Sequence, residues 1–277
     1  MSQATCVDFL KWAMPRLGLA WPAFQRVHRQ VCKRLGHRLA ELGLADFAAY
    51  RDYLLAHEAE WSAVDACCRV TVSRFYRDRD VFDELTAKEL PALAASAGAR
   101  GASGLRAWSA GCAAGEEAYS LVLAWKFGTA AQYPQLGFEV IGTDIDEEEL
   151  ARARQGCYRP SSLQDLPEAW RTAAFQSTDG GACLRPEYRL PVEFRRQDVR
   201  ADAPRGPFDL ILCRNLAFTY FDLAQQRIVL AVLLRELAPH GRLVIGRREN
   251  LPNGVTDLVI ENARLRIFRH VPHALAA

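Results

Sequence analysis

The stretch RAWSAGCAAGEEAYSL, residues 106–121, decides the fold. A short apolar segment leads into a glycine-rich loop, and two glutamates then open a helical pattern. An α/β protein builds a nucleotide pocket in this way, at the carboxyl end of its first parallel strand. Gly111 and Gly115 let the backbone approach a ligand where a side chain would block it. The stretch therefore predicts a ligand site at this loop.

The charges at the loop indicate which ligand it suits. The loop does not read G-x-G-x-x-G, and no Lys-Ser or Lys-Thr pair follows its second glycine, so the usual phosphate cradles are missing. Glu116 and Glu117 stand at the helix start instead, where they would repel phosphates. They suit a ligand with a positive end, such as S-adenosylmethionine (SAM) with its sulfonium and ammonium groups. The alternative is that both acids merely complement the helix dipole.

Composition places the chain among ordinary soluble globular proteins. Its 277 residues suit one large domain, or a main domain with a smaller one, and 50% of them are hydrophobic. The net charge of +2 gives no case for nucleic acid. The first residues carry no signal-peptide pattern and no stretch reaches membrane-span length, so we expect a cytoplasmic protein without membrane insertion.

The cysteines and histidines are not spaced as the ligands of a metal site would be. The eight cysteines are scattered without a C-x-x-C pair, and the six histidines are also dispersed. We therefore expect reduced thiols that mostly fill the core, and no metal site.

The first 85 residues read as helical. Between residues 26 and 42 an apolar stripe recurs at helical spacing, and between residues 46 and 56 a second helix is expected. The stripe consists of Val27, Val31, Leu35, Leu39 and Leu42. The basic residues off the stripe either dock an acidic partner or form a solvated face. Because AASAGARGASG at 94–104 resembles a linker, we expect a helical substrate-docking domain at 1–85, a linker at 86–105 and a second domain at 106–277.

Strands and helices alternate after this linker. Strands are expected at 105–108, 138–145, 208–213, 243–246 and 265–270, and helices at 116–127, 147–155 and 225–237. The segment FDLILC at 208–213 is a continuous apolar run, typical of a strand buried on both faces of a parallel sheet. The alternation predicts an α/β fold with a doubly wound sheet. The ligand should lie over the carboxyl ends of the first, second and fourth strands.

Asp144 fits this geometry. A carboxylate at the end of the second strand can accept hydrogen bonds from both ribose hydroxyls of a nucleoside. The alternative is that Asp144 simply caps the following helix. Its distance from Gly111 in the sequence is longer than in dinucleotide-binding proteins, so the residues alone favour a nucleoside cofactor that is not a dinucleotide.

Four blocks then resemble one family, the chemotaxis receptor methyltransferases of the CheR type. The first block is TVSRFYR with Asp78 after it, similar to N-x-T-x-F-F-R-D, and the second is WSAGCAAGEEAYS, similar to W-S-A-G-C-S-T-G-E-E-P-Y-S. The third is GTDIDEEELARARQGCY, similar to T-D-I-D…L-x-x-A-x-x-G-x-Y. The fourth is FDLILCRNLAFTYFD followed by LAPHGRLVIGRREN, similar to F-D-x-I-x-C-R-N-V-x-I-Y-F-D and L-x-P-G-G-x-L-x-x-G-H-S-E. The run CKRLGHRLAELGLADFAAYRDYL resembles the family's small helical domain. The resemblance spans nearly the whole chain, with the blocks in order.

The resemblance implies a SAM-dependent enzyme that esterifies glutamate side chains of an acidic protein, such as a chemoreceptor helical bundle. It implies a Rossmann-like class I methyltransferase sheet preceded by a small all-helical domain, in a monomer that needs no metal. It carries over cofactor-binding roles to Thr71, Ser73, Arg77, Gly111, Glu116, Asp144, Asp198, Val199, Asn215 and Leu216. It carries over catalytic roles to Arg77, which would position the acceptor carboxylate, and to Tyr220, near the transferred methyl group.

Several positions depart from the family pattern. Thr71 and Ser73 replace an Asn and a Thr, and both keep a hydrogen-bonding atom. One extra residue separates Asn215 from Tyr220, and a single insertion re-aims the side chains after it. Arg247 and Arg248 replace a His-Ser pair and either recruit a more acidic acceptor or are solvated surface.

Two questions stay open in the sequence. Arg77 could form a structural ion pair with Asp78 or Asp80 instead of binding a substrate. The acceptor could be a carboxylate of a small molecule or peptide, and the chain could also be a non-catalytic module that binds SAM and a partner protein.

Overall fold

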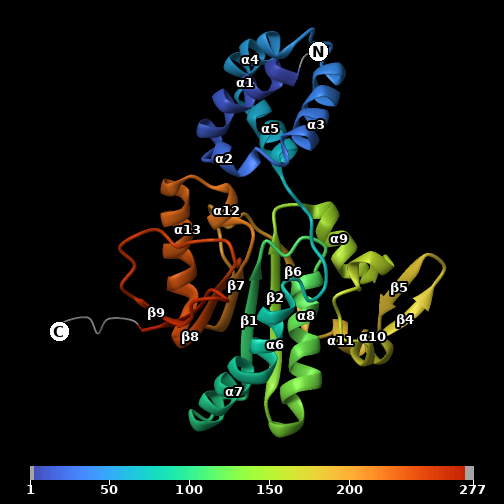
Figure 1. Ribbon diagram of the computed structural model, residues 1–277, viewed down its shortest axis with the longest axis vertical. Coiled ribbons are helices and arrows are strands. Elements are labelled where there is room, and N and C mark those ends of the chain that lie inside the picture. The colour runs from blue at the N-terminus through green and yellow to red at the C-terminus, as the bar shows by residue number, and fades with distance from the viewer. Residues whose placement is uncertain (1–2, 272–277) are drawn as a thin grey trace. The chain divides into compact units, whose positions relative to one another are not determined.

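A computed structural model describes residues 3–271 of the chain, which form two compact units (Figure 1). One unit comprises the residues up to Val70 together with Thr219–Gln226. The other comprises Thr71–Phe218 and the residues from Arg227 onward. Within the described residues, no helix combines the length and the apolar character needed to cross a membrane.

The smaller unit is helical. Its N-terminal helices are α1 (Gln3–Ala13), α2 (Trp21–Phe24), α3 (His28–Glu41), α4 (Phe47–Ala56) and α5 (Trp61–Cys68), with 3-10 turns at Met14–Leu17 and Glu58–Glu60. The predicted stripe is confirmed for Val31, Leu35 and Leu39, which α3 buries. The Asp46 side chain caps α4 by accepting a hydrogen bond from the Ala49 N–H.

The larger unit is built on a seven-stranded sheet with the order β6-β2-β1-β7-β8-β10-β9. The strands are β1 (Gly104–Ala110), β2 (Gly137–Asp144), β6 (Val192–Arg196), β7 (Phe208–Cys213), β8 (Leu237–Ile245), β9 (Leu258–Asn262) and β10 (Ile267–His270). The pairs from β6 to β8 are parallel, and β10 runs antiparallel to both of its neighbours. The order reverses between β1 and β7, so the doubly wound sheet predicted above is confirmed.

The helices after α5 lie between residues 79 and 236. In chain order they are α6 (Arg79–Glu84), α7 (Leu90–Ala99), α8 (Glu116–Ala124), α9 (Glu147–Gln155), α10 (Glu168–Ala174), α11 (Pro186–Arg189), α12 (Ala217–Tyr220) and α13 (Leu223–Glu236), with π turns at Leu85–Glu89 and Trp125–Thr129 and 3-10 turns at Ala130–Gln132 and Pro160–Ser162. Helix α8 packs on β1, β2 and β6, and Figure 1 shows it lying along the central strands.

The segment expected to be a linker is largely helical. Helix α7 occupies Leu90–Ala99 and packs on β1, with Leu90, Leu93, Ala94 and Ala97 buried. Alanine is the strongest helix former, and small side chains let a helix lie close to a sheet. The same Ala/Gly/Ser composition that resembles a linker therefore also suits a closely packed helix.

A second, three-stranded sheet was not predicted. Its order is β3-β5-β4, with β3 at Cys157–Tyr158, β4 at Phe175–Thr178 and β5 at Gly181–Leu184. These strands are too short to show an alternating apolar pattern.

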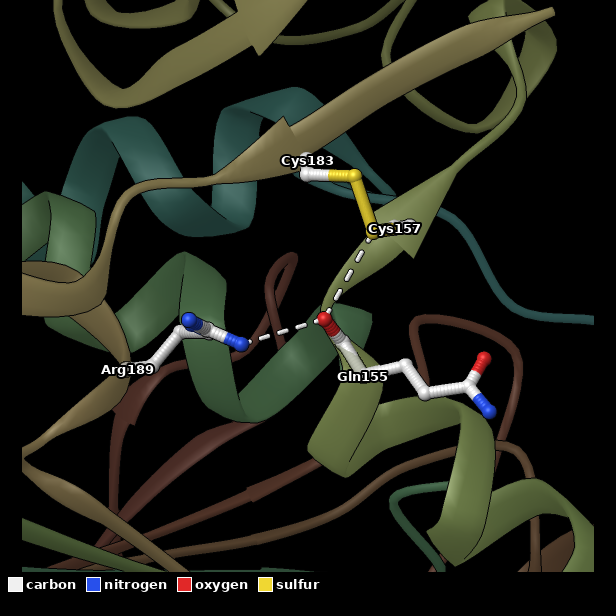
Figure 2. Close-up of a disulfide and its surroundings, with 4 residues drawn as sticks. All are labelled: Gln155, Cys157, Cys183 and Arg189. Atoms are coloured by element: carbon white, nitrogen blue, oxygen red, sulfur yellow. Dashed lines mark hydrogen bonds between the residues drawn. A yellow bond between two sulfur atoms is a disulfide. The ribbon is translucent and has the colours of Figure 1, made fainter. Parts of the chain in front are cut away.

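Two disulfides cross-link the chain, one in each unit. Cys6 pairs with Cys32 between α1 and α3, and Cys157 pairs with Cys183 where β3 and β5 lie in register (Figure 2). The expectation of reduced thiols is therefore wrong for these cysteines. Pairing depends on the distance between Cα atoms in the fold, here 6.0 and 4.0 Å, which spacing along the sequence does not report. Cys67, Cys68, Cys112 and Cys213 are free.

Candidate functional site

The glycine-rich loop after β1 is anchored on the end of β2. The backbone N–H groups of Gly111 and Cys112 both donate to the Thr143 carbonyl, at 2.8 and 3.0 Å. A Cβ on Gly111 would lie only 2.5 Å from the Leu216 side chain, and Gly111 has φ +74°. The loops after β1 and β7 therefore converge here, as the sheet order requires, and only glycine fits at this position.

Asp144 ends β2 and faces this loop. Its Oδ2 accepts a hydrogen bond from the Ala113 N–H at 2.8 Å, and its Oδ1 accepts one from the Asp146 N–H at 2.9 Å. The cap of α9 is Asp146 instead, which accepts from Glu148 and Glu149. The alternative of a simple helix cap at Asp144 is therefore wrong. These contacts orient its carboxylate beside the loop.

Glu116 is the buried acid at the start of α8. Its residue exposure is 3%, and burial raises the pKa of its carboxyl above the usual value. Oε1 accepts a long hydrogen bond of 3.4 Å from the Ser162 hydroxyl, and the Ser73 hydroxyl also interacts with the carboxylate. Oε2 is buried and has no hydrogen-bond partner among the described residues. A buried carboxylate with an unsatisfied oxygen suits a cationic ligand, because an ammonium would both pair its charge and donate hydrogen bonds.

Asp198 and Val199 follow β6, the strand beside β2. Asp144 is the register partner of Arg196, and the Gln197 N–H donates to the Asp144 carbonyl at 3.0 Å. Val199 is buried, while the Asp198 carboxylate is held by the Arg200 guanidinium at 2.7 Å. The two residues thus lie at the same edge of the sheet as Asp144.

Asn215 follows β7 with φ +56°. Its N–H donates to Glu249 Oε2 at 3.0 Å, and the Gly246 N–H donates to the same oxygen. The buried Glu249 therefore ties the loop after β7 to the loop after β8, which keeps Asn215 and Leu216 at the carboxyl edge of the sheet.

Arg77 lies in the segment that opens the larger unit, together with Thr71 and Ser73. The Phe75 N–H donates to the Ser162 carbonyl at 2.9 Å, and the Tyr76 N–H donates to the Ser120 hydroxyl at 2.9 Å. The segment is thereby fixed to α8 and to the turn that also supplies the Ser162 hydroxyl to Glu116. The structure thus brings Ser73 and Glu116 together, whereas Thr71 makes no side-chain hydrogen bond within residues 3–271.

The structural alternative for Arg77 is wrong. Its guanidinium donates to the Val72 carbonyl at 2.9 Å and forms no ion pair with any residue of the described range 3–271. Asp78 pairs with Arg214 at 2.7 Å, and Asp80 pairs with Arg247 and Arg264 at 3.2 and 3.4 Å. Arg77 therefore retains donors for a ligand.

Tyr220 belongs to the other compact unit. Its ring packs against Phe24 with the centroids 5.2 Å apart, and its carbonyl accepts a hydrogen bond from the Ala20 N–H. Its predicted position near the transferred methyl group stays a prediction.

Two residues at this edge were missed as functional candidates: Ser162 and Arg214. Arg214 pairs with Glu117 Oε2 at 3.1 Å, and the Ser109 hydroxyl donates to Glu117 Oε1 at 2.8 Å. An arginine placed directly after the apolar residues Leu210–Cys213 of β7 was the available signal for Arg214. Ser162 offers no such signal, because only the fold brings it to Glu116.

No group of three or more His, Cys, Asp or Glu side chains suited to a metal ion occurs within the part of the chain that the structure describes. The carboxyl edge of the sheet instead offers carboxylates as acceptors, with backbone amides and the Arg77 guanidinium as donors. This set matches an organic cation that also carries hydroxyl and carboxylate groups.

Comparison with known proteins agrees with this geometry. Residues 71–266 match the family model described as CheR methyltransferase, SAM binding domain. The chemotaxis protein methyltransferase of Salmonella typhimurium is 34% identical over 82% of this chain and 77% of its own length. The chemotaxis protein methyltransferase of Listeria monocytogenes is 32% identical over 66% of this chain and 67% of its own length.

A larger relative matches as well. An uncharacterized 104.1 kDa protein of Rhodobacter capsulatus is 31% identical over 88% of this chain, which spans 25% of that protein. The family match begins at Thr71, the first residue of the larger unit, and covers all four loops that form the candidate site. The chain therefore belongs to the CheR methyltransferase family and carries its SAM-binding domain.

Proposed function

We propose that the chain is a SAM-dependent methyltransferase that esterifies carboxylates, specifically glutamate side chains of a chemoreceptor-like protein. The observation that carries the proposal is the buried Glu116 carboxylate, whose Oε2 has no hydrogen-bond partner among the described residues. Chemotaxis methyltransferases among the relatives support the choice of acceptor.

The residues around Glu116 fit SAM group by group. Glu116 would hold the ammonium, with Ser73 and Ser162 orienting its carboxylate. Asp144 would accept from the ribose hydroxyls, and Asp198 and Val199 would flank the adenine. Gly111, whose backbone lies against the Leu216 side chain, would line the methionine end together with Asn215 and Leu216.

The reaction needs little acid–base help from the protein. When bound, SAM would supply a methyl group on a sulfonium, and the neutral thioether S-adenosylhomocysteine would be the leaving group. A glutamate acceptor is already ionised near neutral pH, since its unperturbed pKa is about 4.3, so no general base is required. Arg77 would bind the acceptor carboxylate through charge-assisted hydrogen bonds and hold one oxygen toward the methyl group. The Tyr220 hydroxyl would orient SAM, the other reacting partner.

The smaller unit offers a surface for an acidic protein. On α3, Arg29 and Lys33 are exposed, and neither forms an ion pair with any residue of the described part of the chain. Arg34 and Arg38 on the same helix are used internally, by the carbonyls of Cys67 and Arg69 and by Glu60. A receptor helix rich in glutamate would therefore dock mainly through Arg29 and Lys33. We further propose that the protein works in the cytoplasm as a monomer, without nucleic acid, metal or membrane insertion.

The test uses methyl-labelled SAM, the purified full chain and lysate of the host cell. The expected result is label in protein that leaves as volatile methanol under mild alkali, which is the signature of a carboxyl methyl ester. The Glu116→Gln variant is the matched control, because it removes the charge and keeps the side-chain shape.

Each other outcome names a different function. Label that enters only small molecules would contradict a protein acceptor and favour a small carboxylate. Intact SAM binding without any labelled product in lysate or receptor-rich membranes would favour a non-catalytic module. Protein label that survives alkali would rule out ester formation.

A further inference from the structure

Arg77 lies between two residues with unusual backbone conformations. Tyr76 and Asp78 both have φ +57°, in the left-handed region. Aspartate visits this region readily, but a bulky residue such as tyrosine is an outlier there. Such conformations persist only where the surrounding structure holds them, and they concentrate at functional sites. The direction of the Arg77 side chain therefore depends on whatever holds this turn.

Arg214 is the main support of the turn. Its Nη2 donates to the Arg77 carbonyl at 2.9 Å and pairs with Asp78 Oδ2 at 2.7 Å. One nitrogen thus fixes both the backbone of Arg77 and the side chain of the residue after it. The Ser120 hydroxyl holds the other side of the turn by accepting from the Tyr76 N–H.

The other end of the same guanidinium is bound to the cofactor side of the site. Its Nη1 pairs with Glu117 Oε2 at 3.1 Å, and Glu117 directly follows Glu116 at the start of α8. The Arg214 side chain is 1% exposed, and its guanidinium lies 5.5 Å from the centre of the Phe82 ring. Only a planar fork with several donors can reach the carbonyl and both carboxylates together.

We propose that Arg214 is a positioning residue that aims the Arg77 guanidinium at the methyl acceptor. It does so by holding the left-handed turn at residues 76–78 against the start of α8. The proposal rests on the proposed role of Arg77 in binding the acceptor carboxylate. Arg214 itself touches neither the acceptor nor SAM in this arrangement, and acts through the Arg77 backbone.

The first test measures the turn without any substrate. Hydrogen–deuterium exchange of residues 71–80 is compared between the full chain and Arg214→Lys, which keeps the charge and loses the fork. We expect exchange in this segment to rise by about tenfold or more. Arg242→Lys is the matched control, because Arg242 also forms a buried ion pair, with Glu89, in elements that do not contain the turn. It should leave residues 71–80 unchanged.

The second test is a double-mutant cycle on turnover, with alkali-labile methyl incorporation from host-cell lysate as the assay. We expect Arg214→Lys to lower kcat by roughly 10- to 100-fold, while the Kd for SAM changes by less than about threefold. In an Arg77→Ala background the same substitution should lower kcat by less than about twofold, since it acts through Arg77.

Several outcomes would overturn the proposal. Unchanged exchange at residues 71–80 would remove Arg214 as the support of the turn. An equal loss of kcat in both backgrounds, or a loss of SAM affinity in step with kcat, would make Arg214 a part of the cofactor site instead.

Two controls keep the test decisive. Should Arg214→Lys fail to fold, Asp78→Asn removes one ion pair while keeping a residue that tolerates positive φ, and it should give the same pattern at smaller size. Should the wild-type chain label no acceptor, the proposed function fails, and the exchange experiment still decides whether Arg214 holds the turn.

Discussion

Two buried glutamates, one in each compact unit, have pKa values that shift in opposite directions. Glu60 in the smaller unit has its pKa lowered, first by hydrogen bonds from Arg38. Glu116 in the larger unit has its pKa raised, first by burial. Residue exposures of 9% and 3% show that both carboxyls are removed from water, so burial alone does not explain the difference.

The difference lies in their partners. The Arg38 guanidinium binds both Glu60 oxygens at 2.8 Å, and the Tyr50 hydroxyl donates to Oε1 at 2.8 Å. Glu116 receives hydroxyl contacts and no ion pair from the described residues. A fully partnered buried acid stabilises the fold, whereas a buried acid without a counter-charge is kept for a ligand.

The two glutamates therefore act on stability with opposite sign. Because the pKa of Glu60 is lowered, its contribution is present above the ordinary carboxyl pKa and is lost as the pH falls through the lowered value. Because the pKa of Glu116 is raised, the ligand-free protein gains from its neutral form, and this contribution is lost as the pH rises through the raised value.

The largest expected effect comes from removing the partnered acid. We expect Glu60→Ala to lower the free energy of unfolding by about 3 kcal/mol, because the substitution leaves the buried Tyr50 hydroxyl without its acceptor and removes the buried partner of Arg38. Chemical denaturation followed by circular dichroism measures this. Glu41→Ala is the control, because Glu41 also pairs with Arg38 but is 63% exposed, and it should cost less than about 1 kcal/mol. An equal loss of unfolding free energy in the two variants would contradict the larger contribution expected from the buried Glu60.

Substituting the unpartnered acid should have a smaller and opposite effect on folding. We expect Glu116→Gln to weaken SAM binding by about 2 kcal/mol, through loss of a charge-assisted contact to the ammonium. The same substitution should raise the melting temperature of the ligand-free protein, because a buried charge is gone. Calorimetry and thermal melts measure the two effects. The control is Glu148→Gln, because Glu148 is exposed and this substitution should change neither quantity. Normal SAM binding by Glu116→Gln would contradict the assignment of Glu116 to the ammonium.

Asp144 differs from both glutamates, since its carboxylate accepts hydrogen bonds from the backbone N–H groups of Ala113 and Asp146. We expect Asp144→Asn to weaken SAM binding by about 1 to 2 kcal/mol through the lost ribose contacts. Titration with a 2′-deoxy analogue of SAM provides the control: the wild-type chain should lose affinity on deoxygenation, and the variant should lose much less. The same loss in both proteins would place Asp144 away from the ribose.

The smallest expected effect is on pH dependence. SAM affinity should fall as the pH falls through the raised pKa of Glu116, by no more than about tenfold per pH unit, because the neutral acid cannot pair with the ammonium. Isothermal titration between pH 5 and 8 measures the slope. The Glu116→Gln curve should be flat over this range, and a slope that persists in the variant would assign the titration to another group.

Strong local signals made the centre of the fold predictable. Strand β7 at Phe208–Cys213 and helix α9 at Glu147–Gln155 have the predicted bounds, because an unbroken apolar run and a capped, charged helix are both visible over a few residues. Strand β6 at Val192–Arg196 was missed because it reads VEFRR, too polar for a sheet interior, and it pairs through the sheet with β2 alone. Helix α7 was in part taken for a linker, because small residues suit both a linker and close packing.

The candidate site could be predicted from the sequence where the motif itself contains the residues proposed to bind the ligand. Gly111, Glu116 and Asp144 follow from the loop pattern and from the strand before each of them. The supports of the site were not predictable, because they come from distant segments. Arg214 and Asp78 are 136 positions apart, and nothing near either residue indicates the pairing. For the same reason the sequence suggested an ion pair between Arg77 and its neighbours, whose carboxylates are in fact taken by Arg214, Arg247 and Arg264.

The smaller unit includes Thr219–Gln226, a segment that lies just beyond β7, so the chain passes from one unit to the other at three points in the sequence. Within that unit, Leu19 forms a β-bridge with Phe221, and the Asp222 N–H donates to the Gly18 carbonyl. The helical unit is therefore not a detachable N-terminal module. A chimaera that exchanges the helical unit between relatives should transplant residues 219–226 together with the first 70, and evolution is expected to have varied the two stretches in concert.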